Sequence, residues 1–179
     1  MNLTKFKNLR APGECLCSEK SPHILILVGT PLTGKSWFCN LFKENIDSDV
    51  IVISRDECVM EVYGSRNYTE AFKSVNQKEV DKVLTQKFLD ANLAKKNVIV
   101  DMTHMSSKRR KKNLNYFSDD YYKIGVIFPI LSVDEYERRN QKRIEEENKD
   151  ISMGIVKSMI SSYQPVMIDE GFNKLITLK

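Results

Sequence analysis

The feature that most constrains this chain is a glycine-rich loop at residues 29–36, which reads G-T-P-L-T-G-K-S. An apolar run at 24–28 precedes the loop and a helical pattern opening at Trp37 follows it, which is the strand–loop–helix setting this motif requires. The two glycines allow successive N–H groups to point inward at a phosphate, and the next helix adds its positive N-terminal end. The motif predicts a nucleoside triphosphate site formed by Gly29, Thr30, Pro31, Leu32, Thr33, Gly34, Lys35 and Ser36.

Two side chains at the end of the loop have separate expected roles. Lys35 is expected to reach the β- and γ-phosphates, and the hydroxyl of Ser36 is expected to bind Mg²⁺. The sequence therefore predicts ATP and Mg²⁺ as cofactors.

The bulk composition is that of one globular domain. The chain has 179 residues, 41% of them hydrophobic and 29% charged, and a net charge of +4 that is compatible with an anionic substrate. Its longest apolar run, 24–28, is too short to span a bilayer, and no signal-peptide pattern opens the sequence, so we expect a cytoplasmic protein that contacts no membrane. The four cysteines lack zinc or redox spacing and are expected as free thiols: Cys15, Cys17, Cys39 and Cys58.

Apolar strand patterns alternate with helical patterns along the chain. Strands are expected at 23–28, 50–53, 98–100, 123–128 and 175–178, and helices at 36–44, 68–95, 107–117, 133–147 and 153–163. This alternation predicts an α/β fold in which helices cover both faces of a parallel sheet. We expect an irregular N-terminal arm at 1–22 and a single domain at 23–179.

Two acidic residues follow expected strands, at the edge where ligands bind in such sheets. Asp56 follows the second strand and Asp101 ends the third. A carboxylate there can accept the proton of an attacking hydroxyl or hold the waters around Mg²⁺. The alternative is that each acid caps the next helix. His104 is a weaker candidate, because a single histidine near a site is more often structural.

Arginines recur in the helix expected at 133–147. Arg139 and Arg143 are four residues apart and therefore project from one face. Cations on a mobile lid can stabilise the charge that develops on a transferring phosphoryl group. We place this lid at about 138–152, with its polar tip at 147–150. The alternative is a solvated face in which glutamates of the same helix pair with the arginines.

A run of five cations occupies residues 108–112, K-R-R-K-K. It favours either contact with a phosphate backbone or a solvated helix face. The nearby aromatic residues follow helix and strand periods, which is typical of core positions.

These blocks together resemble the 5′-hydroxyl polynucleotide kinase family in the form found in phage end-repair enzymes. The likeness covers 24–163 and rests on the loop, on R-D-E at 55–57, on V-I-V-D at 98–101 with R-R at 109–110, and on R-N-x-x-R at 139–143. The segment at 151–159 is similar to the helix that follows the lid of that family.

The resemblance implies a kinase acting on a DNA or RNA 5′ end. By that similarity Asp56 is the general base, Arg143 contacts the donor phosphates with Arg139 as its companion, and Asp101 organises the site. Catalytic roles are thus expected for Lys35, Asp56, Asp101 and Arg143.

Two departures affect the acceptor side of the site. Val59 stands where the phage enzymes have an arginine that grips an acceptor phosphate, and Met102 stands where a small polar residue is usual. A small-molecule, nucleoside or modified-base kinase on the same fold and a non-catalytic nucleotide-binding module are the alternatives.

Overall fold

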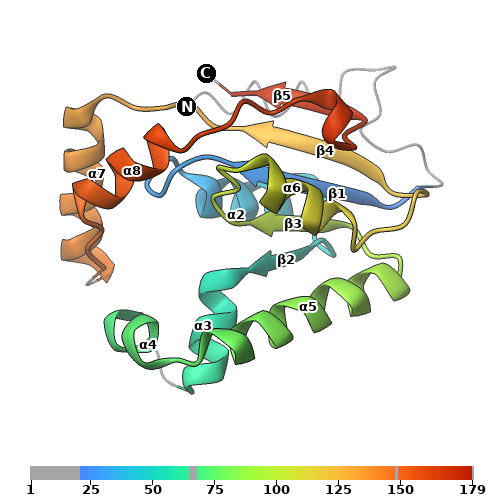
Figure 1. Ribbon diagram of the computed structural model, residues 1–179, viewed down its shortest axis with the longest axis horizontal. Helices are drawn as coiled ribbons and strands as arrows, with labels where there is room; N and C mark the ends of the chain where they lie inside the picture. Colours follow the sequence, from blue (N-terminus) through green and yellow to red (C-terminus); the bar gives the residue numbers. More distant parts are fainter. Residues whose placement is uncertain (1–20, 65–67, 148, 179) are drawn as a thin grey trace.

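The computed structural model describes residues 21–64, 68–147 and 149–178. The arm expected at 1–22, with Cys15 and Cys17, lies almost entirely outside these ranges. Figure 1 shows one sheet through the middle of the molecule, with helices on both of its faces and at one end.

All five strands of the sheet run parallel, in the order β2-β3-β1-β4-β5. The strands are β1 (His23–Val28), β2 (Ile51–Ser54), β3 (Val98–Asp101), β4 (Tyr122–Ile127) and β5 (Lys174–Thr177). Each lies within one or two residues of its expected position, so the predicted α/β fold with a parallel sheet is confirmed.

Successive side chains of β1 point to opposite faces of the sheet and divide the core in two. Ile24 and Ile26 pack on the face covered by α3 (Arg55–Tyr63), α5 (Gln77–Leu93) and α6 (Ser107–Leu114). Leu25 and Leu27 pack on the other face, against α2 (Lys35–Asn45). A strand buried on both faces must be apolar throughout, which explains the unbroken run I-L-I-L-V.

One helix, α3, lies where the sequence pattern predicts none. Its apolar residues do not follow a clear period, but Ser54 precedes it, two acids occupy its first turn, and it ends at Gly64, whose φ of 74° is left-handed. These start and stop signals could have identified it. The acidic residue Asp56 therefore lies in the first turn of α3, just beyond the tip of β2.

The single helix expected at 68–95 is interrupted. The structure has α4 (Tyr68–Ser74) and α5, separated by Asn76, whose side-chain oxygen accepts a hydrogen bond from the N–H of Lys78 at 3.0 Å. Asparagine at this position starts a new helix because its side chain satisfies a backbone donor that would otherwise be unpaired.

The last two helices stand at the end of the sheet toward which the strands point, on the left of Figure 1. They are α7 (Val133–Glu147), whose expected bounds are confirmed, and α8 (Met153–Ser161). A short 3₁₀ helix, η2 (Ile168–Glu170), then leads into β5.

A buried polar network joins α6 to η2 and corrects the view of 108–112 as one exposed cationic run. Arg110 is 0% exposed, and its guanidinium makes a bidentate ion pair with Glu170 at 2.6 and 2.7 Å. It also donates to the carbonyl oxygens of His104 and Pro165. Arg110, Asn113 and Leu114 recur at helical spacing, so they form the inward face of α6.

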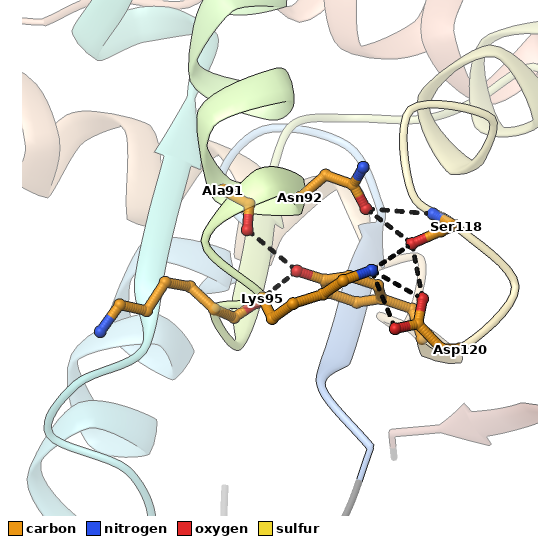
Figure 2. A network of polar contacts seen from close by, with 7 residues as sticks. Ala91, Asn92, Lys95, Ser118 and Asp120 are labelled. Carbon is orange, nitrogen blue, oxygen red and sulfur yellow. Dashed lines mark hydrogen bonds and ion pairs between the residues drawn. The ribbon is translucent and has the colours of Figure 1, made fainter.

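At the end of the sheet where the strands begin, hydrogen bonds join the end of α5 to the turn before β4. Figure 2 shows Lys95 bonded to the hydroxyl of Ser118 and paired with Asp120, and Asn92 accepting from the same hydroxyl. Lys95 lies 2.7 Å from Ser118 and 2.8 Å from Asp120, and the bond from Ser118 to Asn92 is 2.9 Å long. The buried hydroxyl of Tyr121 donates to two backbone carbonyl oxygens, those of Ala91 and Lys96, each at 3.0 Å. These bonds fix the end of the molecule that carries no candidate site.

Within the described ranges, Cys39 and Cys58 are free buried thiols, as expected. None of the helices in those ranges combines the length and the apolarity needed to cross a lipid bilayer.

Arg110→Ala should lower the free energy of unfolding by about 3–5 kcal/mol, because it leaves the carboxylate of Glu170 buried without its partner. Urea unfolding followed by circular dichroism measures the loss. The matched control is Arg109→Ala at the exposed neighbouring position, where a change within about 0.5 kcal/mol is expected. Similar losses for the two variants would show that the buried pair contributes nothing specific to stability.

Candidate active site

The phosphate loop joins β1 to α2 in the conformation that its motif requires. Gly34 precedes α2 with a left-handed φ of 91°, which glycine adopts without strain. A β-carbon on Gly29 would lie 2.8 Å from the β-carbon of Phe128, so only glycine fits there. Both glycines of the motif therefore have a direct structural requirement.

Lys35 lies inside the loop. Its ammonium donates to the carbonyl oxygens of Gly29 at 3.0 Å and of Thr30 at 2.6 Å. Burial lowers the pKa of Lys35 to about 8, and the carboxylates of Asp101 and Asp56 partly oppose that shift. The effect of both acids on one lysine shows that they lie within electrostatic reach of it.

Ser36 and Asp101 are brought together from two elements. The hydroxyl of Ser36, at the start of α2, donates to the carboxylate of Asp101, at the end of β3, at 2.7 Å. Burial raises the pKa of Asp101 above its usual value, while the bond from Ser36 and the charge of Lys35 act in the opposite direction. The helix that follows, α6, is preceded by Ser106 as its N-cap, so Asp101 does not act as a helix cap.

Asp56 is exposed, whereas Asp101 is partly buried. It does not cap α3, because that position belongs to Ser54. Its neighbour Arg55 donates to Asp81 and Gln77 of α5 and so fixes the first turn of α3 against that helix. Asp56 also contributes to the raised pKa of Asp101, which places its charge at the same edge of the sheet.

The oxygen groups of this edge suit a magnesium ion bound jointly with phosphates. Among the described residues, no three His, Cys, Asp or Glu side chains cluster closely enough to hold a metal alone. Ser36 and Asp101 supply one hydroxyl and one carboxylate side by side, and Mg²⁺ in kinases is held by one or two such groups together with phosphate oxygens.

His104 has a structural position. It is fully buried, and its Nδ1 lies 2.8 Å from the carbonyl oxygen of Leu27 while Asn113 lies 2.9 Å from its Nε2. Because a carbonyl only accepts, Nδ1 carries the proton. Burial lowers the pKa of His104 to about 4, so the ring is neutral near pH 7 and unsuited to proton transfer.

Helix α7, where the sequence predicts the start of a lid, contacts the loop through its inner face. Arg139 donates to Glu135 at 2.6 Å and to the carbonyl oxygen of Leu32 at 3.0 Å. Hydrogen bonds from Arg138 and Arg139 lower the pKa of Glu135 to about 2. The arginine at 139 is therefore both paired with a glutamate, as the alternative interpretation expects, and attached to the loop.

Arg143 acts on the loop through its charge. Its charge lowers the pKa of both Lys35 and Asp101, so its guanidinium is within electrostatic reach of the phosphate loop. It also pairs with Glu147 at 3.6 Å. The link to α8 is bound to the same helix, because the side chain of Asn140 bonds Asp150 and the N–H of Ile151.

One contact of α7 involves a residue that is not among the sequence-based candidates. Tyr136 is buried and its hydroxyl lies 2.6 Å from that of Thr30. A single buried aromatic side chain in an otherwise charged helix, three residues before Arg139, is the signal that could have identified it.

The two positions that depart from the phage pattern both face inward. Val59 is fully buried in the core, so it contributes nothing to an acceptor surface. Met102 packs partly against the same core, and Asn113 donates to its sulfur at 3.7 Å.

A small pocket of about 190 Å³ opens beside the loop. Residues 28–30, the strand end and connection at 127–130, Met105 and Tyr163 form its mainly apolar wall. It is smaller than the roughly 300–1,000 Å³ of sites for drug-sized ligands, so it suits one ring of a larger molecule.

The exposed cations of α6 begin beside this pocket. Lys108, Arg109, Lys111 and Lys112 are exposed, whereas Arg110 is not. The carbonyl oxygen of Met105, which lines the pocket, accepts from the N–H of Gln164 at 2.9 Å and joins the start of α6 to the end of α8.

Comparison with known proteins agrees with this geometry. The family model AAA_33, described as an AAA domain, matches residues 24–166. No protein with a curated function matches the sequence.

Solved structures of similar fold include kinases that act on different substrates. A chain of the Pnkp1/Rnl/Hen1 RNA repair complex is 23% identical with a TM-score of 0.66, over 79% of this chain and 44% of that one. A fungal RNA kinase is 17% identical with a TM-score of 0.56 (89% and 75% covered), and a gluconokinase from Sinorhizobium meliloti 1021 is 9% identical with a TM-score of 0.52 (89% and 83% covered). This chain spans less than half of the repair protein, and identities this low show the fold alone, which is that of a P-loop kinase.

Nucleotide affinity should fall as the pH rises through about 8, because the free loop then holds Lys35 as a neutral amine that must take up a proton to bind phosphate. Affinity about tenfold weaker at about pH 9 than at about pH 7 is expected, with proton uptake detected by titration calorimetry in buffers of different ionisation enthalpy. Lys35→Arg is the control, since a guanidinium does not titrate in this range. A wild-type affinity as independent of pH as that of the variant would contradict the assignment.

Proposed function

This chain belongs to the AAA_33 family, whose P-loop fold binds nucleotides, and from that premise we propose that it transfers the γ-phosphoryl group of ATP to a hydroxyl, most favourably the 5′-hydroxyl of a DNA or RNA end. The observation that carries the proposal is that the two carboxylates beside the loop have different surroundings. Asp101 is partly buried and bonded to Ser36, whereas Asp56 is exposed and within electrostatic reach of Lys35.

The two carboxylates suit two different tasks. Asp101 and Ser36 would hold Mg²⁺, which when bound neutralises charge on the phosphate oxygens. Asp56 is exposed at the same edge of the sheet and within electrostatic reach of Lys35, so it suits the acceptance of a proton from the attacking hydroxyl.

The donor side consists of the loop and two cations. The backbone N–H groups of the loop and the N-terminus of α2 bind the phosphates, and Lys35 moves from the carbonyl oxygens of Gly29 and Thr30 to a phosphate oxygen. Arg143 adds positive charge from α7, where charge spreads over the transferring group.

Exposed cations support a nucleic-acid acceptor. α6 begins at the edge that holds Asp101, and its first turn exposes Lys108 and Arg109. Cations near the site can bind the backbone of an oligonucleotide whose 5′ end reaches Asp56. RNA is the substrate named for one structure of similar fold and RNA repair the setting of another, which agrees with this acceptor.

A small-molecule, nucleoside or modified-base acceptor is the second candidate. It is favoured by the size of the pocket beside the loop and by the buried position of Val59, which leaves no arginine there for an acceptor phosphate. A gluconokinase of similar fold is consistent with it. A non-catalytic nucleotide-binding module, the third, is disfavoured by the exposed carboxylate of Asp56 beside the loop.

An acceptor panel tests the proposal. The protein, Mg²⁺ and γ-labelled ATP are incubated separately with 5′-hydroxyl DNA, 5′-hydroxyl RNA, nucleosides and sugar acids. Label transfer to an oligonucleotide supports the first candidate. Transfer confined to a small molecule supports the second, and nucleotide binding without any transfer supports the module.

Asp56→Asn should slow phosphoryl transfer to the active acceptor by roughly 10²–10⁴-fold while ATP affinity stays nearly constant, because only the proton acceptor is lost. Single-turnover rates at saturating ATP measure the chemical step, and calorimetry measures the affinity. Glu57→Gln removes the neighbouring exposed carboxylate as a control. If ATP affinity collapsed while the rate at saturation held, Asp56 would belong to the donor or metal site.

Replacing Lys108 and Arg109 by alanine should weaken oligonucleotide binding. The slope of the logarithm of the binding constant against the logarithm of the salt concentration should become shallower by about 1.4, since each phosphate contact on a single strand contributes about 0.7. Transfer to a mononucleoside should hardly change, because it has no backbone to contact. Arg110 stays unchanged here because it is buried.

The double variant Lys43→Ala with Lys96→Ala is the matched control, because it removes two exposed cations from other elements. Equal salt slopes for the wild type and the α6 variant would mean that this face of α6 is only a solvated surface.

A further inference from the structure

A buried hydrogen bond connects the lid helix directly to the phosphate loop. Tyr136 of α7 is only 2% exposed, and its hydroxyl lies 2.6 Å from the hydroxyl of Thr30. The same tyrosine oxygen accepts a hydrogen bond at 3.3 Å from the N–H of Leu131, which lies just before the start of α7. Since position 30 is one of the variable positions in the loop motif, the motif itself does not account for this pairing.

Thr30 also contacts the residue that binds phosphate. Its carbonyl oxygen accepts from the ammonium of Lys35 at 2.6 Å and from the hydroxyl of Thr33 at 2.9 Å. One residue thus bonds Lys35 through its backbone and the lid helix through its side chain. If Lys35 turned to a phosphate oxygen, the carbonyl oxygen of Thr30 would lose this bond while its side chain stayed bonded to α7.

A second contact joins α7 to the same loop. Arg139, one turn after Tyr136, donates to the carbonyl oxygen of Leu32 on the same loop. Leu32 has a left-handed φ of 68°, unusual for a residue other than glycine, so the loop conformation at this point depends on its surroundings. The inner face of α7 therefore bonds the loop at two residues on either side of Pro31.

We propose that Tyr136 is a positioning residue that couples nucleotide binding in the loop to the position of the lid helix, through its bond to Thr30. The proposal rests on the nucleotide site and the lid described under the proposed function, and it does not depend on the identity of the acceptor. Coupling of this kind is reciprocal: a nucleotide that stabilises the lid position is itself bound more tightly by it, by the same factor.

The test compares Tyr136→Phe, Thr30→Val and the double variant with the wild type. Each single change removes one hydroxyl and keeps the shape of the side chain nearly constant. Two quantities are measured: the dissociation constant of a non-hydrolysable ATP analogue by calorimetry, and the factor by which saturating analogue slows tryptic cleavage within 133–152, followed by mass spectrometry.

In the wild type, the analogue should slow cleavage in 133–152. Each single variant should lose roughly fivefold or more of this protection and bind the analogue more weakly by a similar factor, the lower end of the usual range for coupled sites. The double variant should resemble the single variants, since all three lack the same bond.

Tyr121→Phe is the matched control. Tyr121 is equally buried, its hydroxyl also bonds buried partners, and it lies at the edge of the sheet opposite the loop. Its loss should lower the melting temperature without changing either the affinity or the protection factor. A change in coupling in this variant as large as in Tyr136→Phe would reduce the effect to general destabilisation and overturn the proposal.

The remaining outcomes are distinguishable. Full affinity and full protection in Tyr136→Phe would overturn the proposal, as would losses that add in the double variant. If Tyr136→Phe does not fold, Thr30→Val decides alone, because it removes the other half of the same bond. A wild type that binds nucleotide with lid protection but transfers no phosphoryl group would contradict the proposed function and leave the coupling intact.

Discussion

Parallel pairing of β1 with β3 is the constraint on which the candidate site depends. It aligns Ile26 with Val100, so the loop after β1 and the carboxylate after β3 emerge side by side. Two further bonds hold this junction, from the N–H of Gly29 to the carbonyl oxygen of Thr103 at 3.0 Å and from Ser36 to Asp101. Because Gly29 directly follows β1 and Asp101 ends β3, any shift in the register of the two strands would separate Ser36 from the carboxylate of Asp101.

The sequence predicts the sheet better than it predicts the helices around it. The bounds of β1 and α7 follow from strong patterns, unbroken apolar residues in one and charged residues at helical spacing in the other, and both are confirmed. α3 has no such pattern, because its buried residues are few and irregular. The helix is interrupted at Asn76 because its side chain caps α5, and the spacing of apolar residues gives no sign of such a cap.

The part of the site that could not be predicted from the sequence consists of side-chain partners that are far apart in the chain. The loop and the strand-end acids could be predicted because the motif and the parallel topology determine where they meet. The sequence places Arg110 in a run of exposed cations, because no residue near it indicates that Glu170 will be buried beside it. Likewise, Tyr136 and Thr30 are 106 residues apart, and no local pattern links them. Such pairs follow from the packing of helices, which the folded chain alone reveals.

The position of Lys35 connects the stability of the loop to its expected chemistry. Its ammonium is buried, and the carbonyl oxygens of Gly29 and Thr30 accept its bonds. A phosphate oxygen carries formal charge and makes a stronger bond than a neutral carbonyl, so it can take the lysine from both. The loop carbonyl groups would then lack the bonds from Lys35. The conformation of the loop would depend more on its hydrogen bonds to Tyr136 and Arg139 of α7. In the coupling that we propose, phosphate binding by Lys35 and the position of α7 therefore depend on the same hydrogen bonds of Thr30.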